Sequence, residues 1–179
     1  CNVNACATPN VAVGALTADP APADAQEAAL IAAINATGPD GGTPMSAALA
    51  GALQFSNQYL VQNPDHKTVV ILVTDGEPSG CEENIGAIAN IAATGLLEGT
   101  PTYTVGLAGS NEGQMQQIAI QGGGSAILIG NGDTQAELLA ALQAIQGEQL
   151  ACEIAVPTPT QGTLDPSKVN VTYTPGSGA

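Results

Sequence analysis

The feature that most constrains the fold is an unbroken run of apolar residues at positions 69–73, followed by Thr74 and Asp75. A strand with one face in solvent alternates apolar and polar residues, whereas a strand covered on both faces is apolar throughout. Residues 67–74 are therefore predicted to form the central strand of a parallel sheet. Because open α/β sheets bind ligands beyond the carboxyl ends of their strands, Asp75 falls where a binding site is expected.

The rest of the chain alternates helical and β-branched segments, which is typical of βαβ units. The predicted fold class is therefore α/β, a doubly wound and mostly parallel sheet with helices on both faces. The expected helices are residues 24–37, 44–62, 84–97, 112–121 and one beginning at 134. The expected strands are residues 11–16 (a short edge strand), 67–74, 101–107 and 126–129.

Two of these helices carry specific packing predictions. Thr134 and Glu137 have the spacing of a capping box, which predicts that Thr134 caps the last helix. The last helix and the first helix, residues 24–37, also have apolar residues at helical spacing. The expected apolar stripes are Leu30, Ile31 and Ile34 in the first helix and Leu138, Leu142 and Ile145 in the last.

The composition changes near residue 150, which predicts two parts. Residues 1–150 are expected to form the α/β domain. In residues 151–179 four prolines interrupt any helix, while residues 169–173 alternate like a strand. This segment is predicted to begin a β-rich module, with a pendant tail as the alternative.

The charge of the chain excludes several partners. It has 16 carboxylates, two lysines and no arginine, for a net charge of −14. Binding to nucleic acid requires basic groups that neutralise phosphates, so nucleic acid is excluded, and anionic membranes are disfavoured for the same reason. No apolar stretch approaches the roughly 20 residues of a membrane span. Four cysteines in an acidic chain favour an oxidising compartment, so a secreted or cell-surface location is expected.

The sequence does not predict an enzyme. It contains no P-loop and no G-x-S-x-G motif, and Gly122 to Gly124 lack dinucleotide-binding spacing. No pairing of a nucleophile with a base is evident. His66, the single histidine, precedes the central strand and is expected in a surface loop.

Two oxygen-bearing residues are the candidate cation ligands. Thr43, in the segment Gly-Gly-Thr-Pro, is either a ligand or the N-cap of the helix that begins near Pro44. Asp75 is either a ligand or an acceptor for the backbone of its own turn. Glu77 either reaches the edge of the sheet where Thr43 and Asp75 are expected or is simply solvated.

These two segments together resemble the von Willebrand factor type A family, from about residue 11 to about residue 149. Thr43 in Gly-Gly-Thr-Pro-Met-Ser matches the second loop of that family's metal-ion-dependent adhesion site, and Asp75 in Val-Thr-Asp-Gly-Glu matches the third. The resemblance implies a divalent cation, with magnesium expected and manganese or calcium as substitutes. It also implies a protein partner that offers an acidic residue to the cation.

One part of the family pattern is missing. No Asp-x-Ser-x-Ser motif occurs in these 179 residues, and the family order would place the first strand, first helix and second strand before Cys1. The first strand is central in the family's sheet, so its neighbours would otherwise keep unpaired backbone groups. The chain is therefore expected to be part of a longer or cleaved polypeptide, with the motif roughly 40 to 60 residues upstream.

The family topology also bears on the cysteines. It places Cys1, Cys6 and Cys81 at the top of the sheet and Cys152 at the bottom. A bridge from Cys81 to Cys1 or to Cys6 is expected, a Cys1–Cys6 bridge is the rival, and free thiols are the remaining alternative. Cys152 is expected to pair outside this segment.

The function expected from the resemblance is that of an extracellular adhesion module that captures a protein through the cation. The alternative is a structural component of a secreted or cell-surface assembly, in which metal binding is incidental. Metal-dependent binding of a soluble acidic partner would distinguish the two.

Overall fold

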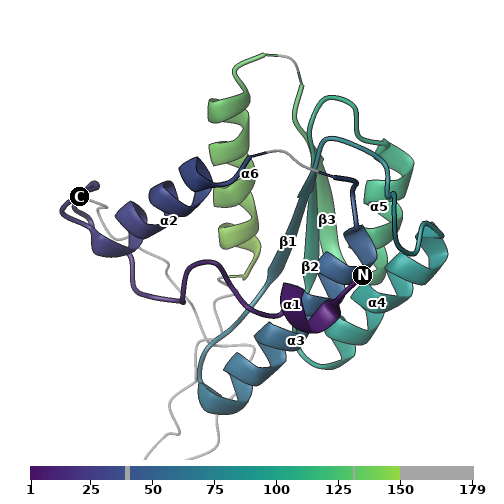
Figure 1. Cartoon of the computed structure of the whole chain (residues 1–179), viewed down its shortest axis with the longest axis horizontal. Coiled ribbons are helices and arrows are strands. Elements are labelled where there is room, and N and C mark those ends of the chain that lie inside the picture. The colour runs from purple at the N-terminus through teal and green to yellow at the C-terminus, as the bar shows by residue number, and fades with distance from the viewer. Residues whose placement is uncertain (39–40, 131, 150–179) are drawn as a thin grey trace, which may run out of the picture. The chain divides into compact units, whose positions relative to one another are not determined.

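The fold is built on a parallel sheet, seen in Figure 1 in this computed structural model, which describes residues 1–38, 41–130 and 132–149. Within these residues the strands β1 (Val70–Thr74), β2 (Thr102–Gly106) and β3 (Gly123–Leu128) lie in the order β1-β2-β3. Both pairings are parallel, with Val70 opposite Thr102 and Thr102 opposite Gly123. The carboxyl ends of all three strands therefore meet at one edge of the sheet.

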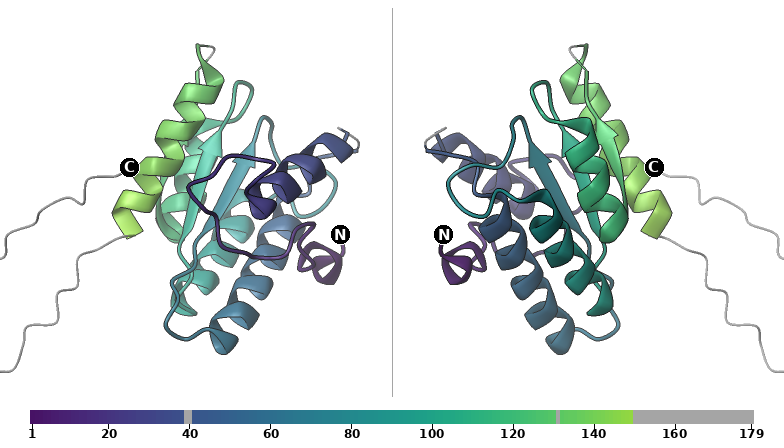
Figure 2. Two further views of the ribbon diagram at one scale, coloured as in Figure 1. Left: turned by 90° about the vertical axis from the view of Figure 1, so that its left-hand side faces the viewer. Right: turned by 90° about the vertical axis from the view of Figure 1, so that its right-hand side faces the viewer.

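Helices cover both faces of this sheet, as the doubly wound α/β prediction requires (Figures 1 and 2). Helices α3, α4 and α5 lie on one face, and α6 lies on the other. The helices are α1 (Val3–Cys6), α2 (Ala25–Ala36), α3 (Met45–Gln62), α4 (Ile85–Leu97), α5 (Glu112–Gln121) and α6 (Thr134–Gln149). All five expected helices are present, and none of the described helices is long and apolar enough to cross a bilayer.

Each face of the sheet has its own apolar core, and both cores contain few aromatic side chains. The α3–α5 side is made of small and aliphatic side chains, and the α6 side is centred on Tyr103 and Val105. The buried members of the first core are Met45, Leu49, Leu53, Val70, Ile88, Ala89, Ala92, Met115 and Ile118. Those of the second are Tyr103, Val105, Ile129, Ala141 and Ile145. Successive side chains of the apolar run, at residues 69–72, point alternately into the second and the first core. The strand that was predicted to be covered on both faces therefore contacts both cores.

Three strand predictions need correction. Residues 11–16 form no strand, because no strand of the described part of the chain lies beside them to pair with. Strand β1, predicted to be central, is at the edge of the described sheet, and β2 is central. Strand β3 begins earlier than predicted because Gly123, at φ +73°, turns the chain from α5 directly into the sheet.

The packing predictions for two helices were partly wrong. Asp133, not Thr134, caps α6, since its carboxylate accepts a hydrogen bond from Ala136 N at 3.1 Å. Ile145 is buried, but Leu142 is 40% exposed. Helix α2 has no buried residues, and its expected stripe lies open, with Leu30, Ile31 and Ile34 between 39% and 71% exposed.

The turn that leads into α2 is held by a buried carboxylate. Asp24 is the N-cap, and it accepts hydrogen bonds from Glu27 N at 2.6 Å and Thr17 N at 2.5 Å. Glu27 in turn accepts a bond from Ala21 N at 2.8 Å. The donors on Glu27 and Thr17 stabilise the carboxylate form, so they hold the pKa of Asp24 below its ordinary value of 3.8.

This arrangement predicts a local opening in acid. Because the folded pKa of Asp24 lies below the unfolded one, its stabilisation is complete above the ordinary value of 3.8 and is lost as the pH falls through the folded pKa. The amide resonances of Thr17 and Glu27 should stay constant above that value and shift together below it. An NMR titration measures this change with pH, and the change should be absent in Asp24→Asn. If the two resonances still shift in that variant, another carboxylate is responsible for the opening.

Candidate functional site

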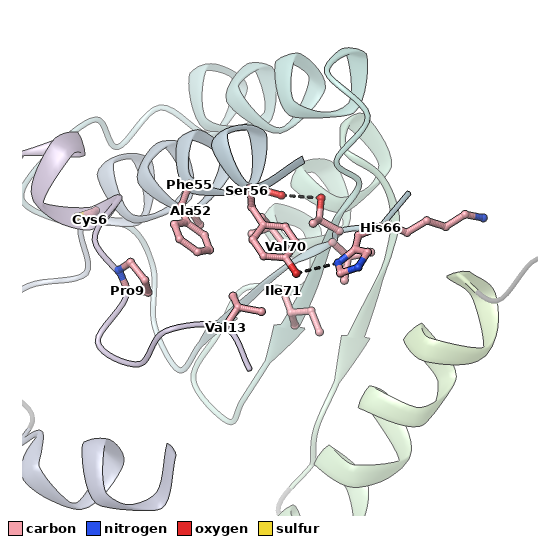
Figure 3. Close-up of a pocket in the computed structure, with 13 residues that line it drawn as sticks. Cys6, Pro9, Val13, Ala52, Phe55, Ser56, His66, Val70 and Ile71 are labelled. Carbon is pink, nitrogen blue, oxygen red and sulfur yellow. Dashed lines mark hydrogen bonds between the residues drawn. The ribbon is translucent and has the colours of Figure 1, made fainter. Parts of the chain in front are cut away.

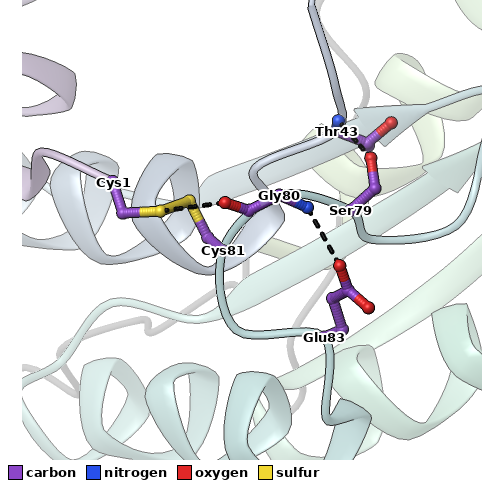
Figure 4. The surroundings of a disulfide bond; sticks show 6 residues. All are labelled: Cys1, Thr43, Ser79, Gly80, Cys81 and Glu83. Atoms are coloured by element: carbon purple, nitrogen blue, oxygen red, sulfur yellow. Dashed lines mark hydrogen bonds between the residues drawn. A yellow bond between two sulfur atoms is a disulfide. The ribbon is translucent and has the colours of Figure 1, made fainter.

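Two loops meet at the carboxyl edge of the sheet, and a pair of hydrogen bonds joins them. Thr43 N donates to Ser79 Oγ at 2.8 Å, and Ser79 N donates to the Thr43 carbonyl at 2.9 Å. Figure 4 shows Thr43 and Ser79 facing each other beside the disulfide. The segment before α3 and the turn after β1 are thus fixed side by side, as expected for Thr43 and Asp75.

The Asp75 carboxylate does not accept a hydrogen bond from the backbone of its own turn, so the alternative given above for this residue is wrong. Thr74 does so, since its hydroxyl accepts a bond from Gly76 N at 3.2 Å and donates to Gly76 O at 3.1 Å. Asp75 is exposed, and its carboxylate makes no hydrogen bond within the described residues. Gly109, at φ +107°, brings the next loop against the Asp75 carbonyl, where a β-carbon would lie 2.5 Å from that oxygen. The carboxylate is therefore left available at a turn that its neighbours hold in place.

Thr43 does not cap α3, so its alternative role is also wrong. The N-cap is Pro44, which provides no side-chain hydrogen bond, and the helix begins at Met45. The Thr43 hydroxyl oxygen lies 3.7 Å from the position that a β-carbon on Gly76 would occupy. The hydroxyl is thus directed at the turn that carries Asp75, and no hydrogen bond within the described part of the chain occupies it.

Glu77 is not merely solvated. Its carboxylate accepts hydrogen bonds from Asn111 Nδ2 at 3.0 Å and Gln114 Nε2 at 3.4 Å. Asn111 also caps α5. These contacts tie the turn after β1 to the start of α5, so Glu77 positions the turn.

A disulfide joins Cys1 to Cys81, one of the two bridges expected from the family topology. Their Cα atoms are 5.7 Å apart across 80 residues of sequence. Figure 4 shows the bridge beside Gly80, whose amide donates to Glu83 Oε1 at 3.0 Å. Cys6 is an exposed free thiol, so the Cys1–Cys6 alternative is wrong. Cys152 lies outside the described residues.

The oxygens of this site fit part of a cation site. In the described ranges no group of three or more His, Cys, Asp or Glu residues could hold a metal ion, so a cage made of this chain's acidic groups is excluded there. One carboxylate and one hydroxyl suit magnesium, which retains several waters and takes few protein oxygens. A magnesium ion placed here would have these two oxygens as candidate ligands and would take its other ligands from water or from other groups.

The sequence did not reveal the part played by Ser79. No sequence pattern around Ser79 distinguishes a hydroxyl that bonds to another loop from one that contacts only solvent. Its partner, Thr43, is 36 residues away in the sequence. The structure alone brings the two loops together.

Two comparisons with known proteins bear on this arrangement. A comparison with curated proteins finds no match for the chain. The family model of the von Willebrand factor type A domain matches residues 20–147, which include Thr43 and Asp75. The match covers most of the chain and agrees with the parallel α/β fold, so this chain belongs to the von Willebrand factor type A domain family.

Proposed function

We propose that this chain acts in an extracellular adhesion module that captures a protein partner through a divalent cation. Members of its family commonly mediate protein–protein interactions. In this proposal Thr43 and Asp75 hold a magnesium ion, which manganese or calcium can replace. The partner contributes a carboxylate to an open coordination position, and no enzymatic step is involved.

One observation carries the proposal. The Thr43 hydroxyl and the Asp75 carboxylate lie on adjoining loops tied through Ser79, and neither makes a hydrogen bond within the described part of the chain. An exposed carboxylate and a half-buried hydroxyl on loops tied this way suit a hard cation.

The charge of the chain gives the cation a second role. A protein with a net charge of −14 repels an approaching carboxylate. A bound divalent cation offsets that repulsion locally and offers a coordination position to the incoming group. Binding that requires the cation is thus the expected route for an acidic partner.

The Cys1–Cys81 bridge supports the proposed location. Such bonds persist in oxidising compartments and are rare in the reducing cytosol. A secreted or cell-surface position is part of the proposal for this reason.

Manganese is a direct probe of the site because its paramagnetism broadens nearby amide signals. Titration of the chain with MnCl₂ should broaden first the amides of residues 43 and 75–77, with a dissociation constant of about 1 mM, as suits a site with few protein ligands. Excess EDTA should restore them. Broadening spread evenly over all exposed carboxylates would contradict a defined site.

A further inference from the structure

One end of the disulfide belongs to the turn that carries Asp75. Ser79 and Cys81 follow Asp75 with no helix or strand between them. Ser79 exchanges two hydrogen bonds with Thr43, and Cys81 is bonded to Cys1 (Figure 4). The turn is therefore attached to the Thr43 segment at Ser79 and to the N-terminal segment at Cys81.

The other end of the disulfide is attached to α3, the helix that follows Thr43. Helix α1 ends at Cys6 against Gly51 of α3, where a β-carbon on Gly51 would lie 2.5 Å from the Cys6 Cβ. Figure 3, a view of the cavity that Cys6 and Ala52 both line, shows the end of α1 next to α3. Cys1 is thus linked through α1 to the helix that begins directly after the Thr43 segment.

These contacts form a closed ring that includes the disulfide. The ring runs from Thr43 through α3 and α1 to Cys1, across the sulfur bond to Cys81, and through Ser79 back to Thr43. Both candidate cation ligands depend on it, since Thr43 lies in the ring and Asp75 begins the turn that closes it. Once the sulfur bond is open, the Thr43–Ser79 contact rests on two hydrogen bonds between half-buried residues, which water can replace.

We propose that the Cys1–Cys81 bridge is a redox switch for the cation site. The switch rests on the proposed function, because it acts on the same site. With the bridge closed, the loops of Thr43 and Asp75 keep the spacing that a shared cation needs. A dithiol reductant supplies two electrons and two protons, so that the sulfur bond opens to two thiols and the dithiol becomes a disulfide. The cation then binds more weakly, because its binding must also order the turn.

The rest of the fold does not depend on the bridge. Neither apolar core of the described residues contains a cysteine, and β1, β2 and β3 pair without residues 1–6. The reduced chain is therefore expected to keep its sheet while residues 75–81 gain freedom. This expectation separates a switch at the cation site from a bridge that only prevents global unfolding.

Cation binding and reduction of the bridge are linked in both directions. Whatever factor reduction takes from the affinity for the cation, a saturating cation must take from the equilibrium constant for reduction. The expected loss of affinity is about tenfold, which corresponds to about 30 mV for a two-electron couple. The cation should therefore make the bridge harder to reduce.

The first test measures manganese affinity in both redox states. In the variant Cys6→Ser/Cys152→Ser, the cysteines of the bridge are the only ones left in the chain. After reduction with a phosphine, which is then removed, this variant should bind MnCl₂ about tenfold more weakly than its oxidised form, measured by amide broadening at residues 43 and 75–77. Adding Cys1→Ser and Cys81→Ser removes every thiol that could bind manganese and should reproduce the affinity of the reduced form.

The second test measures the reduction potential of the bridge in a dithiothreitol buffer. Saturating MgCl₂ should lower this potential by about 30 mV relative to KCl of the same ionic strength. Magnesium is used because it prefers oxygen ligands to thiols. Asp75→Ala, which removes the carboxylate of the site, should abolish the shift.

The remaining outcomes contradict the switch. Equal manganese affinity in both redox states, or a potential that magnesium does not change, would overturn it and leave the cation site intact. A shift that persists in Asp75→Ala would assign the effect to another site. Loss of the dispersed amide signals of β2 and β3 on reduction would show that the bridge holds the whole fold. If the oxidised chain shows no broadening confined to residues 43 and 75–77, the proposed function itself fails, and the switch fails with it.

Discussion

Asp75→Ala should weaken manganese binding at the carboxyl edge of the sheet more than about tenfold, because it removes the site's one free carboxylate. The fold should tolerate the change. Asp75 is exposed and holds no part of its turn, so the free energy of unfolding should change by less than about 0.5 kcal/mol. Isothermal titration with MnCl₂ and urea unfolding measure the two effects.

Two further variants make this test specific. Asp65→Ala removes another exposed carboxylate, one that precedes β1 at the opposite edge of the sheet, and should leave manganese affinity unchanged. Thr43→Val removes the hydroxyl and should weaken binding less than Asp75→Ala, since a neutral oxygen attracts the cation less. It should not loosen α3, because Thr43 provides no cap. Wild-type affinity in Asp75→Ala would favour a structural component in which metal binding is incidental.

Loss of the Cys1–Cys81 bridge should lower the free energy of unfolding by about 3 to 4 kcal/mol. A crosslink across 80 residues removes much of the conformational freedom of the unfolded chain, and the loop-entropy estimate for this length is about 4.5 kcal/mol before losses to residual structure. Urea unfolding of Cys81→Ser against wild type measures the difference.

Cys6→Ser is the matched control for the bridge. Cys6 is an exposed free thiol, so its replacement should change the free energy of unfolding by less than about 0.5 kcal/mol. Reduction of wild type with dithiothreitol should reproduce the Cys81→Ser value. Recovery of Cys81 as a free thiol in non-reducing peptide mapping would show that the pairing is wrong.

The bridge and the Thr43–Ser79 ties act on the same turn. Cys81 follows that turn, Ser79 lies within it, and Glu77 fastens it to α5. Asp75 therefore lies on a segment fixed at several points, although its carboxylate makes no hydrogen bond within residues 1–38, 41–130 and 132–149. The proposed cation would thus meet an exposed carboxylate on a turn that its neighbours hold in place.

The sequence by itself determined the fold class, five of the six described helices and the position of Asp75 after β1. Residues 69–73 are apolar without interruption, which is typical of a strand that contacts apolar cores on both of its faces, and β1 does so. Local signals also placed helix α5 at its observed bounds, because the chemistry that starts and ends a helix lies within a few residues.

Only the tertiary structure decided the contacts between distant segments. In the structure Cys81 is bonded to Cys1 and not to Cys6, and Thr43 is hydrogen-bonded to Ser79. The apolar stripe of α2, Leu30, Ile31 and Ile34, is exposed. Helical spacing shows that a stripe is apolar, but what covers the stripe depends on elements far away in the chain. Residues 11–16 failed to form a strand for the same reason, since a strand exists only where a neighbour accepts its hydrogen bonds.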